Sequence, residues 1–571
     1  MSKDLNTDNN SVASWIVKFL VKRKVEVIFG LQGGHIQSIW DFCYKLGIRI
    51  IDVRDEKAAV HMAQAYSILT DNIGVAMVTA GPGVTNTVTG IANASLSYAP
   101  VLLIGGCSPI PQSNMGALQD IPHIEILKPI TRYSRTARVS EQVIRELDLA
   151  YSYAMGHLGN PGPSYIEIPT DVLRSTVKDK LILSDWIQEK KSYKLYPNPE
   201  DISLLVNKIK KSKRPLLISG RGANKCRDVL IDFLTKTGML YLDTQESKGV
   251  VPLTHESNVF SSRSKVMAEA DLVIILGRKL DYQLAYGSPA IFKEAEFVRI
   301  SDIPDELVDN RRGDPEIYAN PKIVLDKMNN KKLNFDFDKK WILDIKSYHL
   351  SKIAKSKTDV SKILGDDSKI HPNFIFNCIN NLTSGNFFGI ADGGDILSFA
   401  RVSLKSKYYL DSGVFGCLGV GIPYAIAASE IYKDLPIICV IGDGSFGFNA
   451  MEIDTAVRNK SNICVIISNN SAWNIETHDQ KLNYGNRVYG TTLRDTNYAR
   501  MAVALGAYGV RVDDPEKLEE SIEKAIKNTP SVVDVITSSS VLSSDAIKGL
   551  GFVPKYQALD IWDDLENKYR E

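Results

Sequence analysis

The stretch Leu435-Pro-Ile-Ile-Cys-Val-Ile-Gly-Asp-Gly444 joins an apolar run to an acid flanked by two glycines. Twenty-four residues later, after a second apolar run over 463–468, comes Asn469-Asn470. Uninterrupted apolar runs of this length are typical of strands buried on both faces of a parallel sheet. Residues 450–458 between them alternate apolar and polar side chains with helical spacing. We therefore predict a strand–turn–helix–strand unit.

The polar residues of this unit stand where open α/β sheets bind ligands, at the carboxyl ends of strands. Gly442 and Gly444 let the backbone approach an anion closely, and the following helix offers unpaired N–H groups to phosphate. Mg²⁺ is usually held by one or two carboxylates with phosphates and water. We expect Asp443, the Asn470 side chain and the carbonyl of Ala472 to hold this ion. A ligand-free turn is the alternative, which the paired Asn residues disfavour.

This Gly-Asp-Gly … Asn-Asn pattern resembles the signature of thiamine diphosphate (ThDP) enzymes. Residues 28–106 are similar to the pyrimidine-binding domain of acetolactate synthases and benzaldehyde lyase, through Gly30-Leu-Gln-Gly-Gly-His35 and Ala80-Gly-Pro-Gly-Val-Thr-Asn86. Segments 486–493 and 504–509 also resemble benzaldehyde lyase. The similarity covers residues 12–535. It implies an enzyme that uses ThDP and Mg²⁺ to make or break a carbon–carbon bond next to a carbonyl.

Length and strand pattern indicate an α/β protein with three doubly wound parallel-sheet domains, since 571 residues exceed one core. We expect a ThDP pyrimidine-binding domain at 1–183, a central Rossmann-like domain at 200–330 and a ThDP diphosphate- and Mg-binding domain at 369–535. Polar stretches at 184–200 and 327–368 are predicted linkers, and 536–571 a C-terminal tail that could close over the site as a lid. Strands are predicted at 25–30, 48–53, 74–79, 215–219, 239–242, 272–276, 297–301 and 389–392.

Composition excludes several functional classes. A net charge of +1 and 44% hydrophobic residues describe a globular enzyme and not a nucleic-acid binder. The sequence has no apolar run long enough for a membrane helix, and residues 1–6 lack a signal-peptide core. Its seven cysteines have no Cys-x-x-Cys spacing and several lie in apolar strands. We expect a cytoplasmic protein without nucleic-acid or membrane partners.

The resemblance assigns the catalytic acid to Glu56, in Arg54-Asp-Glu-Lys-Ala-Ala59, where related enzymes have a His-Glu-x-Ala-Ala pattern. There a carboxylic acid hydrogen-bonds the aminopyrimidine ring nitrogen, and the cofactor's own amino group then removes the thiazolium C2 proton. A surface acid in the first turn of a helix over 56–67, capped by Asp55, is the alternative. In this family the first and third domains meet across a subunit boundary, which implies a homodimer or a dimer of dimers.

Other cofactor contacts follow from the resemblance. Gly416-Cys-Leu-Gly419 is similar to the loop whose carbonyl accepts the aminopyrimidine N–H and whose apolar side chain, here Leu418, separates the two cofactor rings. Ordinary core packing is the alternative for Leu418. The second diphosphate loop corresponds to Asp392, Gly393 and Gly394. Ser445 and Asn474 are expected to donate to phosphate oxygens.

Substrate contacts carry over from the resemblance in a few positions. Gln119 aligns with a glutamine that faces the thiazole in acetolactate synthases and 2-hydroxyacyl-CoA lyases. Gln32 stands where benzaldehyde lyase has histidine and acetolactate synthases have proline. Glu476 matches an active-site glutamate of the decarboxylase branch, with a helix-surface acid as the alternative. We expect His35 and His61 to be structural and His478 to be at the surface.

The central domain separates the branches of this family. Acetolactate synthases hold FAD there, CoA-ester lyases bind ADP or CoA, and several relatives hold nothing. Asp302 follows a predicted strand and is a candidate acceptor for a ribose hydroxyl, or a turn residue. Our first hypothesis is an acetolactate synthase-like carboligase acting on a 2-oxoacid. The alternatives are a 2-hydroxyacyl-CoA or benzaldehyde-type lyase acting on acyl-CoA or aldehyde substrates and, remotely, a non-enzymatic scaffold.

Overall fold

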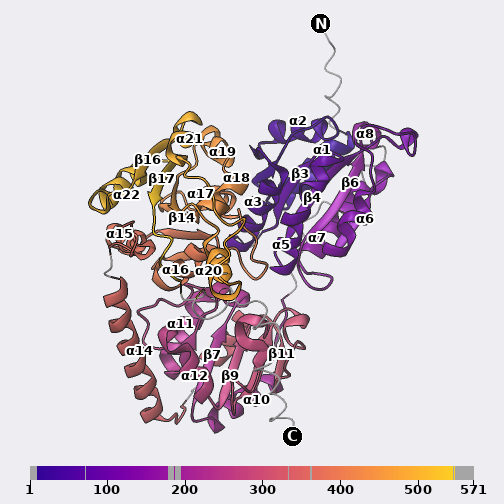
Figure 1. Cartoon of the computed structure of the whole chain (residues 1–571). Coiled ribbons are helices and arrows are strands. Elements are labelled where there is room, and N and C mark those ends of the chain that lie inside the picture. Colours follow the sequence, from indigo (N-terminus) through magenta and orange to yellow (C-terminus); the bar gives the residue numbers. More distant parts are fainter. Residues whose placement is uncertain are drawn as a thin grey trace.

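The computed structural model describes residues 10–70, 72–177, 186, 194–331, 334–360, 363–543 and 546. They form three sheets, of six, five and six strands, in which every strand pair is parallel. In Figure 1 the first sheet is indigo to violet, the middle one magenta, and the third orange to yellow. The expected α/β architecture with three parallel sheets is confirmed.

The first sheet has the strand order β2-β1-β3-β4-β6-β5. Buried side chains cover both faces of β3 and β4, as their apolar sequences predict. The strands are β1 (Val27–Gly30), β2 (Arg49–Asp52), β3 (Gly74–Val78), β4 (Val101–Cys107), β5 (Tyr133–Thr136) and β6 (Ser164–Pro169). The main helices are α1 (Val12–Lys22), α2 (Gln37–Leu46), α3 (Glu56–Leu69), α5 (Val88–Leu96), α6 (His123–Leu127) and α7 (Val143–Ala154).

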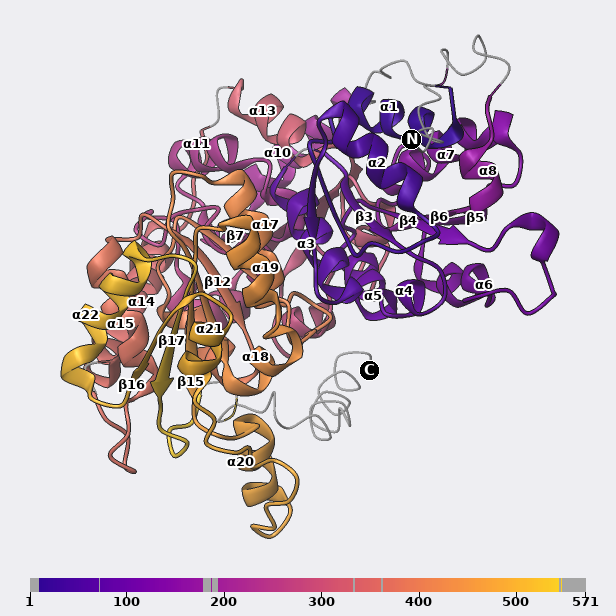
Figure 2. The ribbon, with the colours of Figure 1, turned by 90° about the horizontal axis from the view of Figure 1, so that it is seen from above.

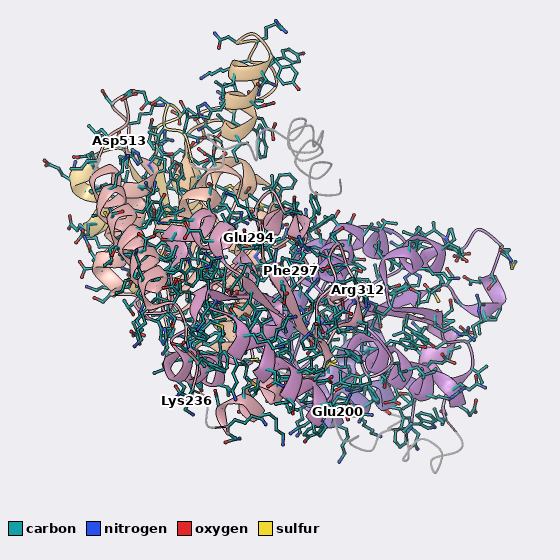
Figure 3. All side chains as sticks on the ribbon, turned by 90° about the horizontal axis from the view of Figure 1, so that it is seen from below. Glu200, Lys236, Glu294, Phe297, Arg312 and Asp513 are labelled. Carbon is teal, nitrogen blue, oxygen red and sulfur yellow. The ribbon has the colours of Figure 1, made fainter. Side chains whose placement is uncertain are left out.

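The middle sheet has the order β11-β10-β9-β7-β8. Figure 3 views this part from below, with Phe297 of β10 labelled near its centre and Lys236 and Glu200 toward its margin. Its strands are β7 (Pro215–Ser219), β8 (Leu240–Leu242), β9 (Leu272–Leu276), β10 (Glu296–Ser301) and β11 (Glu316–Tyr318). Its helices include α10 (Pro199–Lys211), α11 (Arg227–Thr237), α12 (Arg263–Glu269) and α13 (Pro321–Asn329).

The third sheet, ordered β13-β12-β14-β15-β17-β16, repeats the strand order of the first. Its strands are β12 (Phe388–Asp392), β13 (Tyr408–Asp411), β14 (Ile437–Gly442), β15 (Ile463–Asn469), β16 (Tyr508–Val512) and β17 (Ser531–Ile536). Its helices are α15 (Pro372–Thr383), α16 (Asp395–Ser403), α17 (Gly421–Ile431), α18 (Asp443–Asn449), α19 (Glu452–Asn459), α20 (Asn474–Asn483), α21 (Tyr498–Ala504) and α22 (Leu518–Lys527).

Equivalent helices of the first and third sheets pack against each other. Helix α3 connects β2 to β3, and α17 connects β13 to β14, and the two lie side by side (Figure 2). Asn93 Nδ2 donates to Tyr424 Oη at 3.1 Å across this contact. The His61 ring meets the Tyr424 ring edge-on at 6.2 Å. These buried contacts join the two parts into one core, because their apolar side chains belong to a single continuous cluster.

The second predicted linker is helical over much of its length. Residues 327–368 contain the end of α13 and a 22-residue helix, α14 (Lys339–Val360). Lysine and aspartate dominate this segment, but Trp341, Ile345 and His349 recur at helical spacing and are buried against the middle sheet. That narrow apolar stripe holds the helix. Most of the predicted first linker and of the tail at 536–571 lies outside the described residues.

The predicted strands agree with the observed ones within two residues at each end. Helix α3 begins at Glu56, and its N-cap Asp55 accepts a hydrogen bond from the Lys57 N–H at 2.7 Å, as expected. Among the described residues, no helix combines the length and apolar character needed to span a bilayer.

Candidate active site

A cavity of about 340 Å³ opens at the carboxyl edge of the third sheet. Its wall is formed by the residues that follow β12, β14 and β15, together with the loop after β13 and Tyr282 of the middle part. Eight of its residues are predicted cofactor contacts (Gly393, Gly394, Gly416, Leu418, Gly442, Gly444, Ser445 and Asn474), and three are the predicted metal ligands (Asp443, Asn470 and Ala472). The structure thus gathers at one place predicted contacts that range from Gly393 to Asn474 in the sequence.

Three helices begin at this cavity. Helix α16 starts at Asp395, α18 at Asp443 and α20 at Asn474, and all three first residues line the wall. The first N–H groups of a helix have no partner within it and carry partial positive charge. Their convergence makes the cavity suited to a group with several negative charges, such as a diphosphate.

Close backbone approach is built into two of these turns. Gly393 has φ +130°, a conformation that side chains rarely adopt, and it leads into α16. A Cβ atom at Gly444 would lie 2.4 Å from the Trp473 ring, so only glycine fits between α18 and this indole. Because neither residue has a side chain, a ligand in the cavity can approach the backbone closely at both turns.

Asp443 is a buried carboxylate that a bound cation would stabilise. It is 3% exposed, and its Oδ2 atom has no hydrogen-bond partner among the described residues. Burial raises the pKa of Asp443 to about 7, against the opposing effect of backbone N–H groups including that of Ser471. A divalent cation at this oxygen would supply the missing compensation, because a bound ion is the largest local charge in such a site.

The two adjacent asparagines have different positions. Asn469 lies at the end of β15, and its Nδ2 donates to Asp534 Oδ1 at 2.9 Å, which ties β15 to β17. Asn470 lines the cavity, and its Oδ1 accepts the Ala472 N–H at 3.1 Å. Ser471 between them has φ +56°, a strained value for a residue with a side chain. Of the two asparagines, only the second lines the cavity that Asp443 also lines.

Asp392 lies beneath the cavity and not in its wall. It is fully buried, and its carboxylate accepts the N–H groups of Gly419 at 3.3 Å and Gly421 at 2.8 Å. Burial raises the pKa of Asp392 to about 7. Asp392 thereby supports the loop that carries Leu418, and the phosphate contact that the sequence resemblance implied for it stays a prediction.

The predicted residues of the first part do not line this cavity. Glu56 is 6% exposed at the start of α3, and its Oε2 accepts from Asn86 Nδ2 at 2.9 Å. Gln119 stands in the loop after β4, and Gln32, which is exposed, follows β1 and bonds to Gln37. All of them lie beyond carboxyl ends of first-sheet strands, as a ligand site on that sheet requires.

Asp302 and Glu476 have separate surroundings. Asp302 follows β10 and accepts from Arg221 at 2.7 Å, beside a different cavity of about 160 Å³ between the first and middle parts. Glu476 lies in the first turn of α20, where it is exposed but borders the main cavity.

Sequence reasoning overlooked two wall residues and misplaced one histidine. Arg401, the one cationic residue in the described wall, comes from α16, and its Nε donates to Asp411 at 3.0 Å. Trp473 packs over Gly444. His478, predicted at the surface, is 7% exposed because α20 turns it toward Asp395. The position of each residue in or beside its helix relative to the cavity, and not its residue type, determines whether its side chain lies at the cavity or at the surface.

Family comparison matches three consecutive segments to the domains of one enzyme family. Residues 10–126 match the N-terminal TPP binding domain of thiamine pyrophosphate enzymes, 202–328 their central domain and 394–535 their C-terminal TPP binding domain. The chain belongs to the thiamine pyrophosphate enzyme family. Its ThDP-binding domains are therefore those that contain Glu56 and Asp443.

Curated relatives of this ThDP-dependent enzyme fall into two functional groups. The acetolactate synthase large subunit of Mycobacterium tuberculosis is 28% identical over 535 residues, 92% of this chain and 95% of the relative. Human 2-hydroxyacyl-CoA lyase 1 is 28% identical over 553 residues, 92% and 94% of the two chains. Mouse 2-hydroxyacyl-CoA lyase 2 is 28% identical over 536 residues, 85% and 82% of the two. Overall identity therefore does not separate the two groups.

The observed cavity fits the cofactor that the family implies. Asp443 offers a carboxylate oxygen without a partner, Asn470 a neutral oxygen, and the three helix starts offer N–H groups to the diphosphate. No cluster of three or more His, Cys, Asp or Glu side chains occurs in the described part of the chain. Mg²⁺ needs few protein carboxylates when phosphates and water complete its shell, so the Asp443 carboxylate and the Asn470 amide oxygen are a suitable protein share.

Proposed function

We propose that this ThDP-dependent enzyme is an acetolactate synthase-like carboligase that takes a 2-oxoacid as its donor. Arg401 is the observation that carries the proposal. Arg401 lines the cavity in which we place ThDP, with its Nε bonded to Asp411, and the neighbouring polar wall includes Ser412 and Tyr282. A guanidinium is well suited to bind a planar carboxylate, because its N–H groups match the two oxygens.

We assign roles to the chain's residues from their positions together with the family resemblance. Asp443, Asn470 and the Ala472 carbonyl hold Mg²⁺, and the backbone around Gly393, Gly394, Gly442 and Gly444, with Ser445 and Asn474, holds the diphosphate. When bound, ThDP supplies a carbon nucleophile and an electron sink for bond making next to a carbonyl. Leu418 would pack against the bound cofactor, the Gly416 carbonyl would accept a hydrogen bond from it, and Glu56 would hold a proton at its pyrimidine nitrogen. Gln119, Gln32 and Glu476 orient the donor and acceptor.

We further propose that two copies of the chain complete each site. The described wall of the cavity contains no residue from 10–177. Residues 10–126 nevertheless match the N-terminal TPP binding domain of the family, which is expected to contact the cofactor. Within one chain, Glu56 begins a helix that packs along α17 instead. A second copy must then supply Glu56, Gln32 and Gln119, which supports a homodimer or a dimer of dimers.

The lyase activity is the second candidate. Arg221, Asn224, Lys225 and Asp302 line the cavity between the first and middle parts, a set of hydrogen-bond donors and one acceptor suited to a nucleotide such as the ADP portion of CoA. The volume of about 160 Å³ is small for FAD.

We infer a cytoplasmic location from seven cysteines, all within the described residues, that form no disulfide.

Substrate profiling tests these proposals. Purified protein with ThDP and Mg²⁺ is given pyruvate in one assay and a 2-hydroxyacyl-CoA thioester in another. Condensation of pyruvate with release of carbon dioxide, and a higher KM for pyruvate in Arg401→Gln, would support the carboligase. Release of an aldehyde from the thioester, without reaction of pyruvate, would replace it with the lyase.

A further inference from the structure

A buried histidine and glutamate lie under the turn formed by residues 80–83, here called the Gly81 turn. His123 is 2% exposed and Glu167 is 6% exposed. The Gly81 N–H donates to His123 Nε2 at 2.8 Å, and His123 Nδ1 lies 2.8 Å from Glu167 Oε2. The chain Glu167–His123–Gly81 thus runs from the strand β6 to the turn after β3.

The hydrogen bonds fix the protonation of the ring. A backbone N–H can only donate, so Nε2 of His123 is an acceptor and carries no proton. The proton is therefore on Nδ1 and is donated to Glu167. Thr136 Oγ1 donates to Glu167 Oε1 at 2.6 Å and Tyr165 Oη to Oε2 at 2.8 Å, so three donors hold this carboxylate in place.

Two candidate active-site residues touch the Gly81 turn. A Cβ atom at Gly81 would lie 2.7 Å from Gln119 Cβ, so the backbone of this turn is packed directly against Gln119. A Cβ at Gly83 would lie 3.6 Å from Glu56 Oε1. One turn therefore supports both the acid and the glutamine assigned to the reaction.

The conformation of Gln119 needs support from a contact outside its own loop. Its φ of +62° is a left-handed value that costs free energy in a residue with a side chain. Its loop is largely exposed, since Met115 is 76% and Leu118 is 77% accessible. His123 ends this loop and begins α6, so its bond to Gly81 joins the loop to the sheet.

We propose that His123 and Glu167 are a positioning pair: they fix the Gly81 turn, and through it they set the orientation of Gln119 and Glu56. The pair is buried away from the cavity and is not a catalytic group. This inference rests on the proposed roles of Gln119 and Glu56. It assigns a function to a buried, hydrogen-bonded polar pair for which a fold alone has little need, since well-packed apolar residues often stabilise such positions equally well.

A double-mutant cycle tests the coupling. Wild type, His123→Leu, Gln119→Ala and the double variant are compared as holoenzymes with pyruvate as the substrate. His123→Leu is expected to lower kcat on the order of a hundredfold, the typical effect of a 1 Å displacement, with ThDP affinity nearly unchanged. In the Gln119→Ala background the same change should lower kcat less than about threefold, because its target is already missing.

Two further variants separate positioning from stability. His123→Gln keeps an acceptor for the Gly81 N–H and a donor for Glu167, and it should restore most of the lost kcat. His349→Leu removes another buried histidine, which lies on α14 and outside the site. Like His123, His349 accepts a backbone N–H, that of Ser261 at 3.2 Å. Its replacement should lower the melting temperature and leave kcat unchanged. If His123→Leu does not fold, Glu167→Gln takes its place in the cycle.

Hydrogen exchange distinguishes this inference from the substrate assignment, since it needs no turnover. In holoenzyme, amides of residues 117–121 should exchange at least about tenfold faster in His123→Leu than in wild type, through local opening of the loop. Inactivity toward pyruvate with this faster exchange would reject the proposed substrate and retain the positioning pair. Unchanged exchange, or an equal kcat loss in both Gln119 backgrounds, would overturn the pair.

Discussion

Glu452 Oε1 accepts the N–H groups of both Arg54 and Asp55, at 3.0 and 3.1 Å. Glu452 begins α19, directly after the helix of the Asp443 turn, whereas Arg54 and Asp55 immediately precede Glu56. A single carboxylate of the third part therefore fixes the start of the helix that carries the proposed catalytic acid.

The protonation of Glu452 should make stability pH-dependent. Burial raises the pKa of Glu452 to about 7 from 4.5, against the hydrogen bonds from Thr455, Arg54 and Asp55. Between these values the native chain keeps a proton that the unfolded chain has released. Stability from this group is complete below pH 4.5 and falls as the pH rises to 7, by up to about 3 kcal/mol.

Glu452→Gln, which does not titrate, should remove this part of the pH dependence. Urea unfolding of both proteins at pH 5 and pH 7.5 measures it. The wild type should lose more stability than the variant between the two. Parallel losses in both proteins would show that another group is responsible.

Replacement of Glu56 should stop cofactor activation and keep cofactor binding. Glu56→Gln cannot share a proton with the pyrimidine nitrogen in the same way, so C2 hydrogen exchange of bound ThDP in deuterated water should slow about a hundredfold or more. Quenched-flow NMR of the cofactor measures this rate without a substrate. Asp41→Asn, a surface acid paired with Lys45 at 2.6 Å, is the control and should exchange normally.

Removal of the Asp443 carboxylate should release both metal and cofactor. Asp443→Ala leaves only neutral oxygens for Mg²⁺, so ThDP affinity in the presence of Mg²⁺ should fall on the order of a hundredfold. Isothermal titration calorimetry measures both ligands. Asp454→Ala removes a nearby acid on α19 and should bind both normally. Equal ThDP affinity of Asp443→Ala and wild type would contradict the metal assignment.

Two glycines of α18 form a matched pair. A methyl group at Gly444 would collide with the Trp473 ring at 2.4 Å, whereas one at Gly447 would meet nothing within 4 Å. Gly444→Ala should displace Trp473 into the cavity and weaken ThDP binding at least about tenfold, a typical cost of overpacking a filled site. Gly447→Ala should bind ThDP normally and be slightly more stable, because alanine favours helix. Similar ThDP affinities for the two variants would argue against this tight fit.

Hybrid dimers test whether each site uses two chains. Glu56→Gln and Asp443→Ala subunits are coexpressed with different tags, and the hybrid is isolated by both. If the acid and the metal ligand of one site come from different chains, one site carries both lesions and the other is intact. The hybrid should then have about half of wild-type activity, against near zero for either parent. No recovery in the hybrid would place both residues in one chain.

Local sequence pattern predicted most of the strands and the turn at Asp443. The apolar runs before Gly442 and Asn469 are long enough to define buried parallel strands without further information. Helix α14 was missed because only Trp341, Ile345 and His349 mark its buried face within a strongly charged segment. A stripe that narrow becomes evident only when the sheet that it covers is known.

The sequence by itself determined where the cofactor turn lies and which residue types form it. A glycine-flanked acid and a paired asparagine meet requirements that are local to the backbone. Only the tertiary structure decided which neighbour does what. It placed Asn470 in the cavity wall that contains Asp443, bonded Asn469 to Asp534, placed Asp392 under the Leu418 loop, and joined His123 to Gly81 and Glu167. These pairings connect residues far apart in the chain, and their geometry depends on how strands and helices pack, which no local pattern encodes.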